Sequence, residues 1–93
     1  MDGDIGDLPA ARKLADKYNG VLICDEAHSL GTIGKTGRGC EEHFDYKVKA
    51  DIICGSLTKS LGTLGGFIVA TDKLRMFYAF HAHGAVFSAP LSA

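Results

Sequence analysis

The sequence is poor in the features that define several large classes of protein. It contains no run of lysines or arginines and carries a formal net charge of −1, so it presents no electrostatic footprint for nucleic acid or for an anionic membrane. No apolar stretch approaches the roughly 20 residues that cross a bilayer, and the acidic N-terminus is unlike a secretory signal. These absences predict a cytoplasmic protein without nucleic-acid partners, although they leave open the membrane association of a full-length chain.

Cysteine is scarce and shows no ligand pattern. The three cysteines are Cys24, Cys40 and Cys54. They form no C-x-x-C pair, and their odd number gives no support to a disulfide framework or a zinc ribbon. Cys40 with His43, or His81 with His83, would each supply two ligands, whereas tetrahedral zinc needs a closed set of four. We therefore expect Cys24 and Cys54, which lie inside apolar runs, to be buried and reduced, and we expect no metal site.

The remaining residues have the composition of a small globular domain, with 46% hydrophobic and 23% charged residues. Apolar residues recur with helical spacing over residues 7–19, where Asp7 is the expected N-cap. Short apolar runs predict strands at 21–24, 50–56 and 65–71. The first two runs have the continuous apolar character of strands that helices cover on both faces.

The segments around these strands complete an alternating pattern. A second helix is expected over 72–81, and a glycine-rich loop over 29–49 with a turn of helix near 41–44. A short extended piece is expected at 85–88, because a proline follows it. The order of strand, crossover and strand implies an α/β fold with at least two parallel strands and a right-handed connection.

Polar residues follow two of the predicted strands. Asp25 comes directly after the first strand, and residues 56–59 follow the second. Ligands bind beyond the carboxyl ends of the strands in open α/β sheets, so the two segments should meet in one crevice. Asp25 and Lys59 would then face the same ligand.

The stretch VLICDEAH, residues 21–28, is similar to the magnesium-binding strand of a helicase-type ATPase, and GKT follows at 34–36. A phosphate-binding loop requires G-x-x-x-x-G-K-[ST], and Ser29 occupies its first glycine position here. In P-loop enzymes that loop also precedes the acidic strand, whereas GKT follows it. The motif order and the lack of a basic surface therefore argue against a nucleotide-driven motor.

The stretch GSLTKSLGTLGG, residues 55–66, places Lys59 between two hydroxyl residues on the turn after a predicted strand. Such a lysine suits a Schiff-base amine, because hydroxyls can bond a phosphate and glycines let the backbone approach a ligand closely. Taken alone, Lys59 is better explained as an exposed loop lysine, Asp25 as a turn-forming or helix-capping acid and His28 as a loop histidine. The combination of motifs decides between these interpretations.

Three segments, MDGDIGDL, CDEAHSLGTIGKTGRG and GSLTKSLGTLGGFI, together resemble the α-oxoamine synthase family of pyridoxal-phosphate enzymes. The family includes serine palmitoyltransferase, aminolevulinate synthase, glycine acetyltransferase and aminooxononanoate synthase, and the TKS form of the lysine motif is most similar to the first of these. The resemblance covers essentially the whole chain. It implies part of the large domain of the aspartate-aminotransferase-like fold, with a mostly parallel sheet and flanking helices.

The resemblance implies a catalytic role for three residues. Asp25 would pair with the pyridine nitrogen of pyridoxal 5'-phosphate, His28 would bond its phenolic oxygen or a substrate carbonyl, and Lys59 would bind its aldehyde. The chemistry needs these residue types, because a carboxylate keeps the ring nitrogen protonated and a released lysine amine can move the α-proton of the substrate.

The other cofactor contacts that the resemblance implies are hydroxyls. Ser56 and Thr58 match positions that bond the cofactor in relatives, and Ser88 matches a hydroxyl that reaches the phosphate of a neighbouring subunit. Ser88 therefore implies a homodimer. Glu26, between the catalytic positions, reads either as a supporting acid or as a solvated one.

The implied reaction condenses an amino acid, with serine expected, with an acyl-CoA thioester and gives an aminoketone by decarboxylation, as in sphingolipid biosynthesis. The chain is much shorter than members of the family. We therefore expect a fragment of the large domain that lacks the N-terminal part and the small C-terminal domain. The alternative is a catalytically inactive fragment or a partner-binding remnant of such an enzyme.

Overall fold

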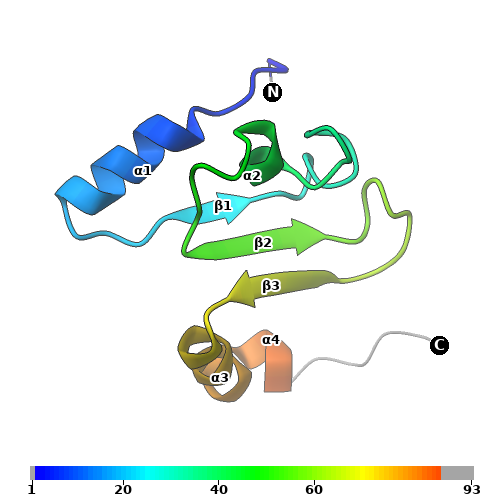
Figure 1. The fold of residues 1–93 in the computed structure, drawn as a ribbon. Coiled ribbons are helices and arrows are strands. Elements are labelled where there is room, and N and C mark those ends of the chain that lie inside the picture. The colour runs from blue at the N-terminus through cyan, green and yellow to red at the C-terminus, as the bar shows by residue number, and fades with distance from the viewer. Residues whose placement is uncertain (1, 87–93) are drawn as a thin grey trace.

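The computed structural model describes residues 2–86. Its elements in chain order are α1 (Leu8–Lys17), β1 (Ile23–Asp25), α2 (Cys40–His43), β2 (Ile52–Ser56), β3 (Gly66–Ala70), α3 (Asp72–His81) and α4 (His83–Val86). Figure 1 shows α1 and α2 on the β1 side of a three-stranded sheet, with α3 and α4 beyond β3. The alternation of helices and strands is confirmed. No helix in this described part is long and apolar enough to span a membrane.

The strands lie in the order β1-β2-β3. β1 pairs in parallel with β2, with Asp25 opposite Cys54. β3 is antiparallel to β2, with Gly66 opposite Ser56, and the chain reverses between them through a loop that includes Gly65 at φ 103. The expected parallel pair is therefore confirmed, whereas the sheet of the described residues is mixed rather than mostly parallel.

The first helix begins and ends where its local chemistry requires. The side chain of Asp7 accepts a hydrogen bond from the backbone N–H of Ala10 (2.9 Å), and Pro9 lies in the first turn. Proline is tolerated there because its missing N–H would have no helical partner. Asn19 has a positive φ of 50, which a helix cannot continue. The helix over 7–19 is thus confirmed, two residues shorter at its C-terminal end.

The expectation that helices cover both faces of the first strand is wrong for the described residues. The strand begins at Ile23 rather than at Val21, and these two side chains are 57% and 65% exposed. Leu8 and Ile52 are the buried apolar side chains of the described part. The helices of this part flank the sheet at its two edges (Figure 1), so they leave much apolar strand surface uncovered.

The extended piece expected at 85–88 is also wrong where the structure describes it. Residues 85 and 86 lie in α4, a helical turn that directly follows α3. Only Ala82, between the two helices, has an extended conformation (φ −78, ψ 118). The described sheet, β1-β2-β3, offers these two residues no strand partner, whereas a helical turn needs only local residues. Residues 87 and 88 lie outside the described residues.

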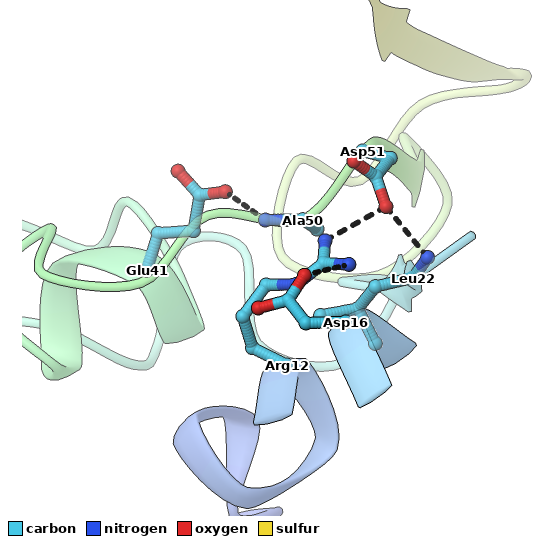
Figure 2. A network of polar contacts seen from close by, with 6 residues as sticks. All are labelled: Arg12, Asp16, Leu22, Glu41, Ala50 and Asp51. Atoms are coloured by element: carbon cyan, nitrogen blue, oxygen red, sulfur yellow. Dashed lines mark hydrogen bonds and ion pairs between the residues drawn. The ribbon is translucent and has the colours of Figure 1, made fainter. Parts of the chain in front are cut away.

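A polar network joins α1 to the sheet (Figure 2). Asp51 Oδ2 accepts hydrogen bonds from Arg12 Nη1 (2.8 Å) and from the backbone N–H of Leu22 (2.7 Å). Arg12 also forms an ion pair with Asp16 one helical turn away (2.8 Å). These contacts lower the pKa of Asp51, chiefly through the bond from Leu22 and then through Arg12. One carboxylate therefore connects α1, the approach to β1 and the start of β2.

Replacing Asp51 with alanine in the full-length protein should lower its free energy of unfolding by about 1–3 kcal/mol, because the Leu22 N–H and the Arg12 guanidinium both lose a charged partner. Asp16→Ala is the matched control. It removes an exposed pair with the same arginine and should change the free energy by at most about 0.5 kcal/mol. Urea unfolding measures both values, and equal effects of the two substitutions would contradict the network.

The contribution of Asp51 should also depend on pH. Because its pKa is lowered in the folded state, its stabilisation is complete above the ordinary value of 3.8 and is lost as the pH falls through the lower folded-state value. The difference in free energy of unfolding between wild type and Asp51→Ala should therefore be constant at neutral pH and shrink below pH 3.8. A difference that stays constant throughout acid titration would argue against an ionised Asp51 in the network.

Candidate cofactor-binding site

A cleft of about 770 Å³ lies at the carboxyl ends of β1 and β2. Its lining includes four of the residues that the sequence singles out: Asp25, His28, Ser56 and Lys59. The parallel pairing of the two strands ends both on the same side of the sheet, so the expected crevice is present. The N-terminal segment 3–6 also lines the cleft; it belongs to the MDGDIGDL motif, to which the resemblance assigned no role in the site.

Asp25 and His28 form one side of the cleft. Asp25 is the last residue of β1, and its Oδ1 accepts a hydrogen bond from the backbone N–H of Ala27 (2.8 Å). Its Oδ2 makes no hydrogen bond within the described part of the chain. His28 is exposed, and its backbone carbonyl accepts a hydrogen bond from Thr32 Oγ1 (2.8 Å). One carboxylate oxygen and the imidazole ring are therefore available to a ligand.

The segment after β2 forms the facing side. The hydroxyls of Ser56 and Thr58 are hydrogen-bonded to each other (2.6 Å), and Ser56 Oγ accepts a second bond from the Thr58 N–H (3.1 Å). Lys59 is exposed and forms no ion pair with any other described residue. Thr58 is not part of the cleft lining and contacts it through Ser56. Ser88 lies outside the described residues.

A hydrogen bond joins the two sides of the cleft. The hydroxyl of Ser60, next to Lys59, donates to the backbone carbonyl of Leu30 (2.5 Å). Gly31 lies directly beside this bond at φ 82, and a Cβ atom on it would meet Ser60 Oγ at 2.6 Å. A glycine is therefore required where the loop after β1 approaches the lysine segment.

The GKT segment lies in a loop that is closed on Glu42. The carboxylate of Glu42 accepts hydrogen bonds from the N–H of Thr36 (2.9 Å), from the Thr36 hydroxyl (2.7 Å) and from the N–H of Arg38 (3.0 Å). These bonds, the Thr36 hydroxyl first, lower the pKa of Glu42. Backbone N–H groups that a phosphate would need are thus bonded to a side chain, in agreement with the prediction that this loop binds no nucleotide.

Glu26 is the supporting acid rather than the solvated one. It is 3% exposed. Its Oε1 accepts a hydrogen bond from the N–H of Cys40 (2.8 Å), and its Oε2 accepts one from the hydroxyl of Ser29. Gly39 at φ 94 lets the backbone approach, since a Cβ there would lie 2.6 Å from the carboxylate. Glu26 therefore holds the end of the loop against the strand that carries Asp25. The sequence alone had left open whether Glu26 is a supporting or a solvated acid.

The family model "Aminotransferase class I and II" matches residues 1–93. The chain belongs to this family. Within the aminotransferase class I and II family, its relatives are α-oxoamine synthases, as the sequence motifs predicted. A serine palmitoyltransferase of Sphingobacterium spiritivorum is 41% identical over 92 residues, which are 99% of this chain and 23% of that protein. An 8-amino-7-oxononanoate synthase of Thermosipho melanesiensis is 41% identical over 99% of this chain and 24% of that protein.

Solved structures agree with these sequence relatives. Serine palmitoyltransferase from Sphingomonas wittichii has a TM-score of 0.85 and 33% identity, over 98% of this chain and 23% of that one. The S. paucimobilis enzyme with a bound PLP-myriocin aldimine has a TM-score of 0.86 and 33% identity, over 98% of this chain and 24% of that one. The fold is therefore confirmed as part of the large domain of the pyridoxal-phosphate transferase fold. The chain spans about a quarter or less of the length of these proteins.

The cleft fits the family's cofactor, pyridoxal phosphate. A ring nitrogen that stays protonated needs a carboxylate oxygen, and Asp25 Oδ2 is available. An aldehyde needs an amine without a competing ion pair, which Lys59 provides among the described residues. Ser56 lines the same cleft as Lys59, and its hydroxyl is hydrogen-bonded to that of Thr58. The cofactor prediction is thus supported by the chemistry of the donor set as well as by the family.

Replacing Ser60 with alanine should speed the local opening of the segment around Lys59, residues 57–65. The Leu30 carbonyl then loses its donor, and a bond worth about 1 kcal/mol corresponds to roughly fivefold faster opening. Hydrogen exchange of the backbone amides of residues 57–65 in the full-length protein measures this effect. Thr63→Ala is the matched control, because the Thr63 hydroxyl makes no hydrogen bond to a described residue. Equal exchange rates in Ser60→Ala and wild type would contradict a stabilising role of the hydrogen bond between Ser60 and Leu30.

Proposed function

We propose that the full-length protein is a pyridoxal-phosphate-dependent acyltransferase of the α-oxoamine synthase type. It condenses an amino acid with an acyl-CoA thioester and releases coenzyme A and carbon dioxide. The observation that carries this proposal is the meeting of Asp25, His28 and Lys59 in one cleft beyond the ends of two parallel strands. Each of these residue types has a distinct task in the reaction.

Pyridoxal phosphate, when bound, supplies an electron sink for the electron pair that remains after an amino acid loses its α-proton or its carboxylate. Asp25 holds a proton on the ring nitrogen through its available oxygen, since a carboxylate favours the charged ring. Lys59 binds the aldehyde and, once released, takes the α-proton as a general base. His28 donates a hydrogen bond to an oxygen of the cofactor or the substrate.

The hydroxyls have a supporting task in this proposal. Ser56 and Thr58 orient the cofactor from the side of Lys59, and their mutual hydrogen bond restricts both side chains. Ser88 reaches the phosphate of a neighbouring subunit, so that the active protein is a homodimer. The site is assembled from side chains and needs no metal for the transfer step itself.

Serine is the amino acid that we propose, with a long-chain acyl-CoA as its partner and sphingolipid biosynthesis as the process. Two observations support this choice: the TKS form of the lysine motif, and the serine palmitoyltransferases among the relatives and the solved structures. The oxononanoate synthases among the relatives support the same reaction type, but they do not support the choice of serine. A cytoplasmic location of the reaction belongs to the same proposal.

The second candidate is a protein without catalysis that binds a partner. The observation in its favour is the exposed apolar surface, since Tyr18 is 71% exposed and Phe80 is 73% exposed. Large exposed apolar surfaces mark interaction sites. The same surface is expected if further parts of a longer enzyme cover it, so activity measurements decide between the two.

The proposal predicts release of coenzyme A when the full-length protein, supplied with pyridoxal phosphate, receives serine and a long-chain acyl-CoA. Lys59→Ala should reduce the turnover by on the order of 100-fold or more, because the general base is lost. Lys35→Ala removes another exposed lysine and should leave the turnover close to that of wild type. The measurement is the rate at which free thiol appears.

Three outcomes test the reaction type, the choice of serine and the role of Lys59 separately. If a protein that has bound the cofactor releases no coenzyme A with serine, glycine or alanine, the acyltransferase proposal fails and the non-catalytic candidate gains. If glycine or alanine reacts faster than serine, only the serine assignment is wrong. If Lys59→Ala and Lys35→Ala are equally active, Lys59 is not the base.

A further inference from the structure

Two cysteines and a buried carboxylate meet beside β1, and the proposed acyl transfer uses none of them. Cys24 and Glu26 stand two residues apart, so their side chains share one face of the extended segment, and Asp25 between them points to the other. Cys40 arrives from the N-terminal end of α2. One ligand atom from each residue, two sulfurs and a carboxylate oxygen, lies within 4.8 Å of the other two.

One spacing in this cluster, between Cys24 and Glu26, is that of a tetrahedral metal site. Zinc–sulfur bonds of about 2.3 Å and zinc–oxygen bonds of about 2.1 Å place a sulfur and an oxygen ligand about 3.6 Å apart and two sulfurs about 3.8 Å apart. The distance from Cys24 Sγ to Glu26 Oε1 is 3.7 Å. Cys40 Sγ lies within 4.8 Å of both other ligand atoms and would move closer to them when an ion binds. Oε1 accepts hydrogen bonds from the Cys40 N–H and from the Cys24 thiol, and the loss of the thiol proton on metal binding would free one lone pair of Oε1 for the metal.

The charges of the cluster also favour a cation. Glu26 is almost fully buried, and no lysine or arginine of the described residues forms an ion pair with it. A buried carboxylate without a positive partner is costly, and hydrogen bonds compensate it only in part. A divalent cation would supply the missing positive charge.

The cluster has a path to solvent. Cys24 and Cys40 both line a second cleft of about 280 Å³ between the start of α1 and β1, and Cys40 also lines the larger cleft. An ion can therefore reach the sulfurs, and a water molecule can occupy the fourth position of the tetrahedron. Glu26 lines neither cleft and closes the site from behind.

We propose that Cys24, Cys40 and Glu26 bind one thiophilic divalent cation, of which Zn²⁺ and Cd²⁺ are the best matches, with water as the fourth ligand. The sequence predicted no metal site, because its ligands are separated by up to 16 residues and match no ligand motif. None of its three ligands is a proposed cofactor-binding residue, although Cys40 also lines the cofactor cleft. Its presence or absence leaves the acyltransferase proposal unchanged.

The affinity of this site should rise with pH. Burial, and next the charge of Glu26, raises the pKa of Cys24 to about 12, and the same two causes raise the pKa of Cys40. A metal ion binds the thiolate form of cysteine, so each sulfur releases a proton when the ion binds.

Titration of Co²⁺ into the reduced, full-length protein saturated with pyridoxal phosphate tests the site. We expect one ion per chain and a sulfur-to-cobalt charge-transfer band in the near ultraviolet, which Zn²⁺ or Cd²⁺ displaces. Cys24→Ser and Cys40→Ser should each weaken binding at least about tenfold. Cys54→Ser is the matched control and should retain the band, because this third thiol donates a hydrogen bond to the Cys24 carbonyl but lies outside the cluster.

The absence of a charge-transfer band, its survival in both Cys24→Ser and Cys40→Ser, or its loss in Cys54→Ser alone would overturn the proposal. X-ray absorption of the Zn²⁺-loaded wild-type protein tests it without any substitution. The expected spectrum contains two sulfur ligands at about 2.3 Å, and a spectrum of oxygen and nitrogen ligands alone would exclude the site.

Discussion

The parallel pairing of β1 with β2 is the interaction on which the candidate site depends. The register places Asp25 opposite Cys54, and the ladder continues one residue further through the hydrogen bond from the Glu26 N–H to the Cys54 carbonyl (2.7 Å). A slip of one residue would turn every side chain of β1 to the opposite face. Asp25 would then leave the cleft, and Glu26 would lose its buried position. The same pairing therefore decides the positions of the proposed catalytic acid and of the cysteine cluster.

Three carboxylates hold the segments around this pair by accepting hydrogen bonds from backbone N–H groups. Asp51 accepts from the N–H of Leu22 just before β1, and Glu26 accepts from the N–H of Cys40 at the start of α2. Glu42 accepts from the N–H of Thr36 in the loop between β1 and α2. A long loop such as residues 26–39 is poorly ordered unless its backbone polar groups find hydrogen-bond partners. Acids supply these partners without long side chains, and glycines at positive φ let them come close. The result is an ordered rim around a cleft, although the described part has a very small apolar core.

The sequence predicted what depends on local patterns and motif spacing. The N-cap Asp7, the parallel pair of β1 and β2 and the meeting of Asp25 and Lys59 in one cleft follow from periodicity and from the rule for parallel strand ends, whereas the antiparallel pairing of β3 was not predicted. Burial could not be predicted in the same way, because Val21 and Ile23 read as core residues and are exposed in the part described here. The long-range partners of Glu26 and the meeting of Cys24 with Cys40 depend on tertiary structure, which no local pattern reveals. The roles of the hydroxyls, Ser88 included, rest on the resemblance alone.

The central claim is that Lys59 is the residue that binds the cofactor, and covalent mapping tests it most directly. The full-length protein is loaded with pyridoxal phosphate, treated with borohydride to convert the lysine–cofactor imine into a stable amine, digested with trypsin and analysed by mass spectrometry. Trypsin does not cleave after a modified lysine, so we expect one labelled peptide that spans residues 50–73. A label on any other lysine, or a loaded protein without a covalent label, would contradict it.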